Sequence, residues 1–189
     1  NTSMKIVSFF LIIFFLIPAL ANSIGNETGL ELPRFISLKS NESNLRVGPS
    51  KNYPITIKYI KNNFPLKIIE EYEDWRKVID FQDNTGWIHK SLIKGERNGI
   101  IISPNKKKVN IYNTVSGVIV GDVTNGSLVQ ITKCKLYWCQ IKKNNYKGWV
   151  EKKFIWGVKQ KEKFNIGIIQ ILDDYLILSI NFINEKIFK

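Results

Sequence analysis

Two tryptophans, Trp75 and Trp138, are the residues of this chain best suited to binding a ligand. Each opens a short stretch of alternating polar and apolar residues. In a strand, that alternation puts both tryptophans on one face and points Arg76, Val78, Cys139 and Ile141 inward. A ring off the core face offers a large contact area at low entropic cost. The tryptophans therefore either line a ligand groove or pack against a neighbouring loop or domain, and the groove could be extended by Tyr53, Tyr59 and Tyr112.

The two cysteines, Cys134 and Cys139, are separated by four residues. If those four residues form a hairpin turn, the cysteines face each other across two strands. Facing Cα atoms lie about 4.5 to 5.5 Å apart, which a disulfide accepts. Free thiols and a metal site are the alternatives, but two thiols without a nearby histidine cannot fill a four-coordinate zinc site. We therefore expect a disulfide and no bound metal.

No arrangement of residues indicates catalysis. His89 is the only histidine, so it has no second histidine or paired nucleophile with which to build a metal site or a triad. Four carboxylates cluster at Glu70, Glu71, Glu73 and Asp74, and paired carboxylates can hydrolyse glycosides. A solvated acidic turn explains them more simply. We expect no enzyme activity and no cofactor.

The elements that carry these residues occur twice. The segments DWRKVIDFQDNTGWIHKSLI (74–93) and YWCQIKKNNYKGWVEKKFI (137–155) share an opening Trp, a polar turn and a Gly-Trp-aliphatic finish. Strands of four to seven residues at about ten-residue spacing, joined by polar turns, are typical of a small sandwich or barrel. The repeat predicts an all-β chain with two copies of one unit, at 33–96 and 107–158, and a linker around Pro104.

The N-terminal residues have the pattern of an export signal. A basic start at Lys5 is followed by an apolar run and a small-residue cleavage site, Ala19-Leu20-Ala21. The run is shorter than the roughly 20 residues that span a membrane. We therefore expect residues 1–21 to be removed, leaving a periplasmic or secreted protein that is not transmembrane. Residues 159–189 are a C-terminal extension whose structure the pattern does not define.

Positive charge is concentrated in the second copy. Residues 100–159 contain 11 basic and 2 acidic residues, a net charge of +9, whereas residues 33–99 carry +4. Such a field attracts polyanions, although a general bias toward lysine also explains it. For an exported protein, the envelope offers lipid head groups and wall polymers before nucleic acid. We expect an anionic envelope surface as a partner and no nucleic acid.

Three motifs give the first copy a family resemblance. They are Asn44-Leu45-Arg46-Val47-Gly48-Pro49, Asp74-Trp75-Arg76-Lys77-Val78 and Gly86-Trp87-Ile88-His89-Lys90-Ser91-Leu92. Together they resemble the bacterial SH3-like domain and, more narrowly, exported tandem SH3-like proteins of Gram-negative, chiefly alphaproteobacterial, genomes. Pro33-Arg34-Phe35 and Trp156-Gly157-Val158 match the usual ends of such chains. The second copy matches less well, with Asn110-Ile111-Tyr112 in place of Asn-Leu-Arg.

The resemblance implies two partly open five-stranded β-barrels in tandem. Related bacterial domains bind peptidoglycan, often through its peptides, and this implies a non-catalytic module for peptidoglycan or peptide recognition. The alternative is an accessory or regulatory subunit that packs on an envelope enzyme and binds no small ligand.

Overall fold

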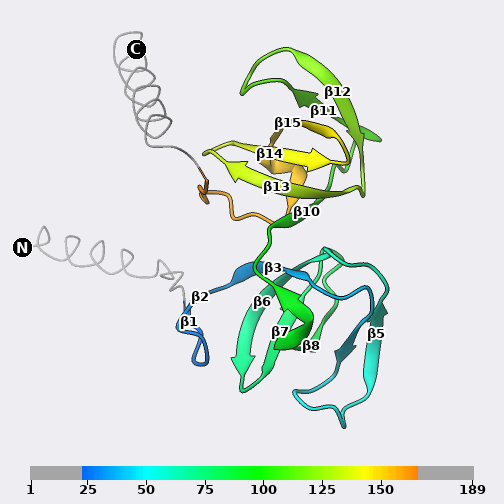
Figure 1. Ribbon diagram of the computed structural model, residues 1–189, viewed down its shortest axis with the longest axis vertical. Helices are drawn as coiled ribbons and strands as arrows, with labels where there is room; N and C mark the ends of the chain where they lie inside the picture. The colour runs from blue at the N-terminus through cyan, green and yellow to red at the C-terminus, as the bar shows by residue number, and fades with distance from the viewer. Residues whose placement is uncertain (1–22, 166–189) are drawn as a thin grey trace, which may run out of the picture.

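The computed structural model describes residues 23–165, and within them the chain folds into two curled antiparallel sheets of seven strands each (Figure 1). The first sheet has the order β5-β4-β8-β7-β6-β3-β9. Its strands are β3 (Arg34–Leu38), β4 (Ser43–Arg46), β5 (Ile55–Tyr59), β6 (Pro65–Tyr72), β7 (Trp75–Ile79), β8 (Thr85–His89) and β9 (Ile93–Lys94).

The second sheet has the order β12-β11-β15-β14-β13-β10-β16, which repeats the first sheet strand for strand. Its strands are β10 (Asn98–Ile101), β11 (Lys108–Tyr112), β12 (Ile119–Thr124), β13 (Leu128–Cys134), β14 (Trp138–Lys143), β15 (Tyr146–Glu151) and β16 (Ile155–Trp156). Short 3₁₀ helices, Lys90–Leu92 and Lys152–Phe154, precede β9 and β16. We call the two sheets barrel 1 and barrel 2.

The predicted repeat is confirmed at the level of register. Arg46 pairs with Trp87 in barrel 1, and Tyr112 pairs with Trp149 in barrel 2. Both barrels also have a register shift at the same place, before Arg46 and before Tyr112. The prediction of an all-β chain built from two small barrels is therefore confirmed.

The expected linker differs from the observed one. β10 lies at Asn98–Ile101, inside the stretch that we expected to be a linker, and it pairs with β13 and β16 of barrel 2. The second sheet therefore begins at Asn98 and not near residue 107. The run Gly99-Ile100-Ile101-Ile102 lacks polar alternation because both faces of β10 are buried.

Each barrel has its own apolar core, formed by alternate residues of its strands. Barrel 1 buries Leu38, Leu45, Leu66, Ile68, Val78 and Ile88 completely. Barrel 2 buries Ile101, Val129, Ile131, Ile141 and Val150 in the same way. Burial of one such side chain contributes about 1.5–3 kcal/mol. The inward positions expected for Val78, Cys139 and Ile141 are confirmed, because these residues belong to the core clusters, and Arg76 is also buried.

A cross-strand link closes the equivalent hairpin in each barrel. In barrel 2, Cys134 and Cys139 are register partners of β13 and β14, their Cα atoms lie 4.1 Å apart, and they form the expected disulfide. In barrel 1 the equivalent partners on β6 and β7 are Glu71 and Arg76, which form an ion pair at 3.4 Å. A buried ion pair thus occupies the position that a covalent bond occupies in the other barrel.

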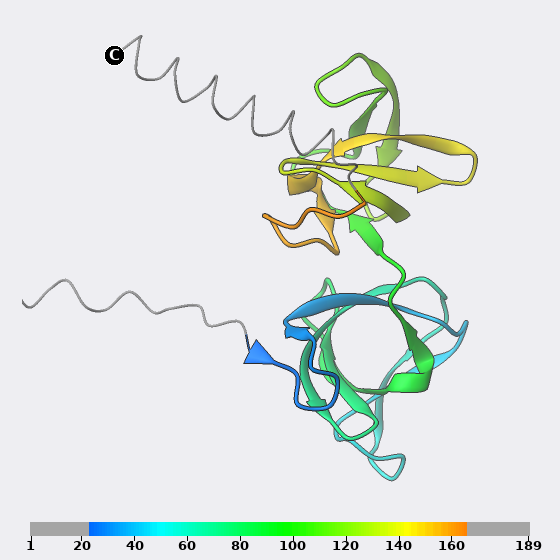
Figure 2. The same ribbon diagram turned by 60° about the vertical axis from the view of Figure 1, so that its left-hand side comes forward.

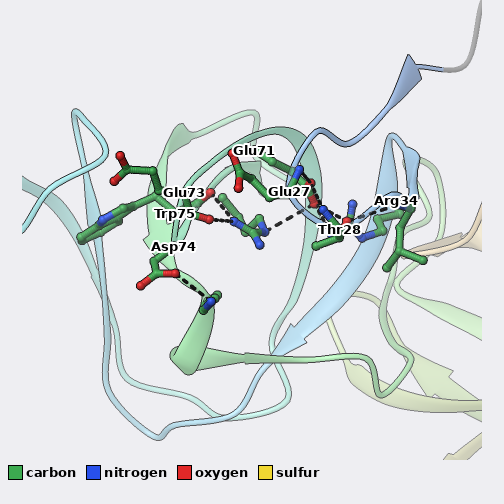
Figure 3. A network of polar contacts seen from close by, with 10 residues as sticks. Glu27, Thr28, Arg34, Glu71, Glu73, Asp74 and Trp75 are labelled. Carbon is green, nitrogen blue, oxygen red and sulfur yellow. Dashed lines mark hydrogen bonds and ion pairs between the residues drawn. The ribbon is translucent and has the colours of Figure 1, made fainter.

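Glu71 also anchors the segment that precedes barrel 1 (Figure 3). A hairpin of β1 (Ser23–Ile24) and β2 (Glu31–Leu32) brings the backbone N–H groups of Glu27 and Thr28 to the Glu71 carboxylate, at 3.1 and 3.0 Å. The Thr28 hydroxyl and the Arg34 guanidinium donate to the same carboxylate, at 2.8 and 2.5 Å. All of these donors come from within the fold, and Glu71 is buried. The sequence suggested that the whole acidic turn is solvated, and for Glu71 this expectation was wrong.

Lys152 anchors the segment that follows barrel 2. Its ammonium group donates to the backbone carbonyls of Lys135, Leu136 and Glu162, at 2.7, 2.9 and 2.7 Å, and its side chain is almost completely buried. Burial lowers the pKa of Lys152 to about 8, and the Glu162 carboxylate opposes that shift. Phe164 pairs through its backbone with Cys134. The first residues of the predicted extension therefore belong to barrel 2.

The two barrels touch through an aromatic cluster and a buried polar contact. Phe35 of barrel 1 and Trp156 of barrel 2 meet edge-to-face, with ring centroids 5.2 Å apart. The Asn98 side-chain amide donates to the Ser37 hydroxyl at 2.9 Å, and both residues are buried. Only residues 95–97 separate β9 from β10, and this short segment joins the two barrels (Figure 2). The predicted signal peptide (1–21) and the extension beyond residue 165 lie outside the described residues.

Glu71→Gln should destabilise the protein by roughly 3 kcal/mol, because it leaves two buried or half-buried arginines without their carboxylate. Glu70→Gln is the matched control, since Glu70 pairs with Lys77 at the surface and its loss should cost less than about 1 kcal/mol. Urea denaturation of both variants measures the difference. Equal costs for the two substitutions would contradict the anchoring role of Glu71.

Acid should weaken the protein partly through Glu71. Burial raises the pKa of this carboxyl, but hydrogen bonds from Arg34 and Thr28 outweigh burial and hold it below its ordinary value of 4.5. A carboxyl with a lowered folded-state pKa stabilises the fold above that ordinary value, and the contribution is lost as the pH falls through the folded-state value. The free energy of unfolding, measured by urea denaturation from about pH 7 to about pH 3, should therefore fall more steeply for the wild type than for Glu71→Gln. Parallel curves would show that Glu71 carries no such linkage.

Candidate binding surface

Barrel 2 brings two of the predicted site residues together. Trp138, the first residue of β14, and Tyr112, the last residue of β11, meet edge-to-face with ring centroids 5.1 Å apart. Both rings are partly exposed, and neither belongs to the core cluster. Edge-to-face pairs of this kind add about 0.5–1.5 kcal/mol beyond burial. The pair therefore forms a rigid, partly open aromatic platform, which we call the Tyr112–Trp138 platform.

The equivalent surface of barrel 1 is closed. Trp75 is only 8% exposed and meets the ring of its register partner His89 edge-to-face, with centroids 5.3 Å apart. In barrel 2 the register partner of Trp138 is Glu151, which has no ring to cover it. Arg46 occupies the position of Tyr112 and donates to the carbonyl of Tyr53 at 2.7 Å. Trp75 therefore packs against a neighbouring side chain, whereas Trp138 occupies a more open position.

Tyr53 lies on the surface of barrel 1, where its side chain is 46% exposed. Its ring covers Gly48 so closely that a Cβ atom at that position would lie 2.7 Å from three ring atoms. Among the described residues, no ring contact joins Tyr53 to Trp75. That Tyr53 and Trp75 line one groove therefore stays a prediction.

The observed position of Tyr59 contradicts the sequence prediction. We expected it to extend a groove, but it is 9% exposed, belongs to the core cluster and packs against Phe64. Its hydroxyl donates to the Asp80 carboxylate at 3.0 Å. Burial raises the pKa of Tyr59, and the Asp80 charge raises it further. Sequence alternation failed here because a tyrosine with a buried acceptor is satisfied inside a core.

Asp80 organises the turn beside this core. One carboxylate oxygen accepts from the backbone N–H groups of Gln82 and Asn84, at 2.8 and 3.0 Å, and the other accepts from the Asn84 side chain at 2.9 Å. These bonds fix the turn between β7 and β8, where Asp83 adopts a positive φ of 63°. Asp80 is therefore a structural carboxylate.

A second feature of barrel 2 was missed by the sequence. A cleft of about 290 Å³ is lined by residues of β11, β12 and the β14–β15 hairpin, including Val120, Tyr146 and Lys147. The neighbouring Val118 and Ile119 are also exposed, and β12 is an edge strand of its sheet. The sequence feature that could have indicated this surface is the apolar run Val118-Ile119-Val120. This run lies between turn residues, does not alternate with polar residues and is too short for a core strand.

Charge reinforces the asymmetry between the barrels. Lys143 and Lys147 lie at the cleft, and Lys135 lies over the ring of Trp149 at 5.9 Å from its centroid. The acidic residues of the same barrel are engaged, Asp122 with Lys108 at 3.0 Å and Glu151 with Lys153. The surface around the cleft therefore carries unneutralised positive charge.

The geometry offers no centre for metal-dependent chemistry in the part of the chain that the structure describes. Within residues 23–165, no cluster of three or more His, Cys, Asp or Glu residues could hold a metal ion. His89 is half-buried, with its Nδ1 atom 2.8 Å from the Ser91 hydroxyl and its Nε2 atom 3.8 Å from the Asp74 carboxylate. No helix among these residues has the length and apolarity that crossing a membrane requires.

Two small, repeated β-barrels with surface aromatic residues define a class of tandem binding modules. The family of bacterial SH3 domains matches the chain twice, at residues 39–95 and 106–157, and so covers more than half of it. The chain belongs to this family of bacterial SH3 domains. The predicted resemblance to the bacterial SH3-like domain is therefore confirmed, and the coarse role that it carries is that of a binding module.

Among solved structures, the chain is similar to NlpC2 and NlpC1 from Trichomonas vaginalis and to an NlpC/P60 family protein from Bacillus cereus. The identities are 15%, 17% and 9%, the TM-scores are 0.30, 0.30 and 0.29, and 70%, 77% and 74% of this chain is covered. The chain spans 51%, 52% and 61% of the lengths of those proteins. A likeness this distant says nothing about activity. No curated protein is significantly similar to the chain.

Tyr59→Phe should lower the free energy of unfolding by about 1–2 kcal/mol, because it removes a buried hydrogen bond to a carboxylate. Tyr53→Phe removes the same hydroxyl from a surface ring, and its effect should stay within about 0.5 kcal/mol. The free energies of unfolding of the two variants, measured by thermal or urea denaturation, show whether each tyrosine lies in the core or at the surface. A larger loss from Tyr53→Phe would contradict the positions assigned to these residues.

Proposed function

We propose that this protein is an exported, non-catalytic binding module that recognises peptidoglycan or an envelope peptide through the Tyr112–Trp138 platform of barrel 2. The observation that carries the proposal is the difference between the barrels. Trp75 is covered by His89, whereas Trp138 is partly open beside Tyr112. Aromatic rings that combine an apolar face with low conformational freedom are the commonest anchors of binding surfaces.

The electrostatic setting supports an anionic or carboxylate-bearing target. The +9 charge of residues 100–159 belongs to the barrel that carries the platform, and such a field raises the rate of association with polyanions. Peptidoglycan peptides carry carboxylates, and the N-terminal export pattern supports a periplasmic or secreted location, where such peptides occur. Membership of the bacterial SH3 domain family favours binding over catalysis.

A second candidate function is an accessory or regulatory subunit that binds an envelope protein and no small ligand. The exposed apolar run of Val118, Ile119 and Val120 on the edge strand β12 favours it. An unpaired strand edge can accept an extended segment of another protein by adding a strand to the sheet. This partner would bind the edge of β12, so its footprint differs from that of a ligand on the platform.

Sedimentation with purified peptidoglycan tests the first proposal. Trp138→Ala should weaken binding about tenfold at about 0.15 M salt, because it removes the anchor ring. Tyr137→Ala is the matched control, since it truncates an exposed neighbouring aromatic residue outside the platform and should leave binding unchanged. Circular dichroism establishes that both variants are folded.

Salt separates recognition from charge. Binding should persist at about 0.5 M salt, where the screening length is shorter than the roughly 8 Å of physiological salt. Loss of binding at high salt in the wild type and both variants alike would show attraction by charge alone. Absence of peptidoglycan binding at both salt concentrations would favour the accessory-subunit function. Capture of an envelope protein by the wild type, and its loss in Ile119→Asp, would then establish that function.

A further inference from the structure

The two terminal segments of the described chain enclose a second cleft, distant in sequence from the platform. It measures about 560 Å³ and is lined by Leu30, Glu31, residues 33–35, Lys67 of β6, Arg97, Lys159, Lys161 and Glu162. The Lys159 ammonium and the Glu31 carboxylate, 2.9 Å apart, join the two sides. The blue N-terminal hairpin and the orange segment after β16 lie on the same side of the molecule in both views (Figures 1 and 2). This volume lies within the range of small-ligand sites.

The walls of this cleft are strongly basic. Five cationic side chains line it against two carboxylates, Glu31 and Glu162. Glu162 is held by Arg97, with the Nη2–Oε2 distance at 2.9 Å, and Arg34 is held by Glu71. Within residues 23–165, Lys67 and Lys161 have no ion-pair partner. The cleft therefore has two cations available for an anionic ligand.

Two guanidinium N–H groups of the cleft lack acceptors. Arg34 Nη1 and Arg97 Nε are buried and have no hydrogen-bond partner among the described residues. A buried donor without an acceptor costs about 1–3 kcal/mol. Both atoms are shielded from solvent, so the two arginines contribute positive charge to the lining of the cleft, and the accessible cations are Lys67 and Lys161.

The floor of the cleft is apolar. We use the term apolar floor for Pro33 and Phe35, which both line the cleft. The Arg97 guanidinium lies 5.8 Å from the centre of the Phe35 ring, and Trp156 meets that ring edge-to-face. Cations beside an apolar floor match a ligand that carries a carboxylate next to an apolar side chain. A peptide C-terminus has this chemistry, and capture of a terminal carboxylate is a known mode of peptide recognition.

We infer that this cleft is a second binding site, separate from the Tyr112–Trp138 platform, and that it takes the C-terminal carboxylate of a peptide whose last side chain is apolar. The site is formed by both barrels together with the segments anchored by Glu71 and Lys152. The inference is independent of the function proposed for the platform.

Isothermal titration with three short peptides tests this site on the purified protein. Acetyl-Ala-Phe should bind at least about tenfold more tightly than its C-terminal amide, because the amide removes the charge-assisted contacts. It should also bind more tightly than acetyl-Ala-Gly, which keeps the carboxylate and lacks the apolar side chain. Equal affinity for the acid and the amide would overturn the site, and equal affinity for the Phe and Gly peptides would overturn the apolar floor.

A charge-matched pair of variants locates the binding. Lys67→Gln combined with Lys161→Gln should weaken binding of acetyl-Ala-Phe about tenfold. Lys51→Gln combined with Lys133→Gln makes the same change in net charge away from the cleft and should have no effect. Equal losses in both pairs would show attraction by overall charge and overturn the proposal. Trp138→Ala should leave this peptide bound, so failure of the platform and failure of this cleft give different results.

Discussion

The buried carboxylate of Glu71 joins three parts of the chain that the rest of barrel 1 depends on. It lies on β6 opposite Arg76 of β7, and it receives Arg34 of β3 and the backbone of residues 27–28. A carboxylate removed from water requires several donors, and here these donors come from three separate parts of the chain. Satisfying one charge therefore fixes a hairpin, a neighbouring strand and the N-terminal segment together.

Barrel 2 holds the equivalent hairpin and its own terminal segment through different interactions. Its disulfide stands where barrel 1 has the Glu71–Arg76 pair, and a loop this short contributes roughly 2 kcal/mol. The terminal segment is held by Lys152, whose equivalent in barrel 1, Lys90, is an exposed residue paired with Asp74. Units of about sixty residues bury little apolar surface, so such polar and covalent links carry a large share of their stability.

These anchors also determine which surfaces are left open. The N-terminal hairpin and the segment after β16 meet beside the junction of the barrels and enclose a basic cleft there. The Tyr112–Trp138 platform remains uncovered because Glu151, and not an aromatic residue, faces Trp138. A protein with two copies of one fold thereby presents two chemically different surfaces, one aromatic and one basic with an apolar floor.

The family, the repeat and most strands followed from the sequence because they rest on local patterns. Alternation across Trp75–Ile79 and Trp138–Lys143, and the Gly-Trp pairs that follow, survive in any environment that buries one face of a strand. The spacing of Cys134 and Cys139 likewise fixed their pairing, since four intervening residues suit a hairpin. Strand β10 was not predicted, because both of its faces are buried and its sequence therefore lacks the alternation of polar and apolar residues.

The candidate sites depended on the tertiary structure. Tyr59 and Tyr53 look alike in sequence, yet one reaches a buried Asp80 and the other covers Gly48 at the surface. Trp75 and Trp138 occupy equivalent positions, but His89 meets the ring of Trp75 whereas Glu151 is the register partner of Trp138. The sequence by itself determined the fold and its duplication, because these follow from periodicity along the chain. Which aromatic residues stay open, and which charges meet at a cleft, was decided by contacts between residues far apart in the chain.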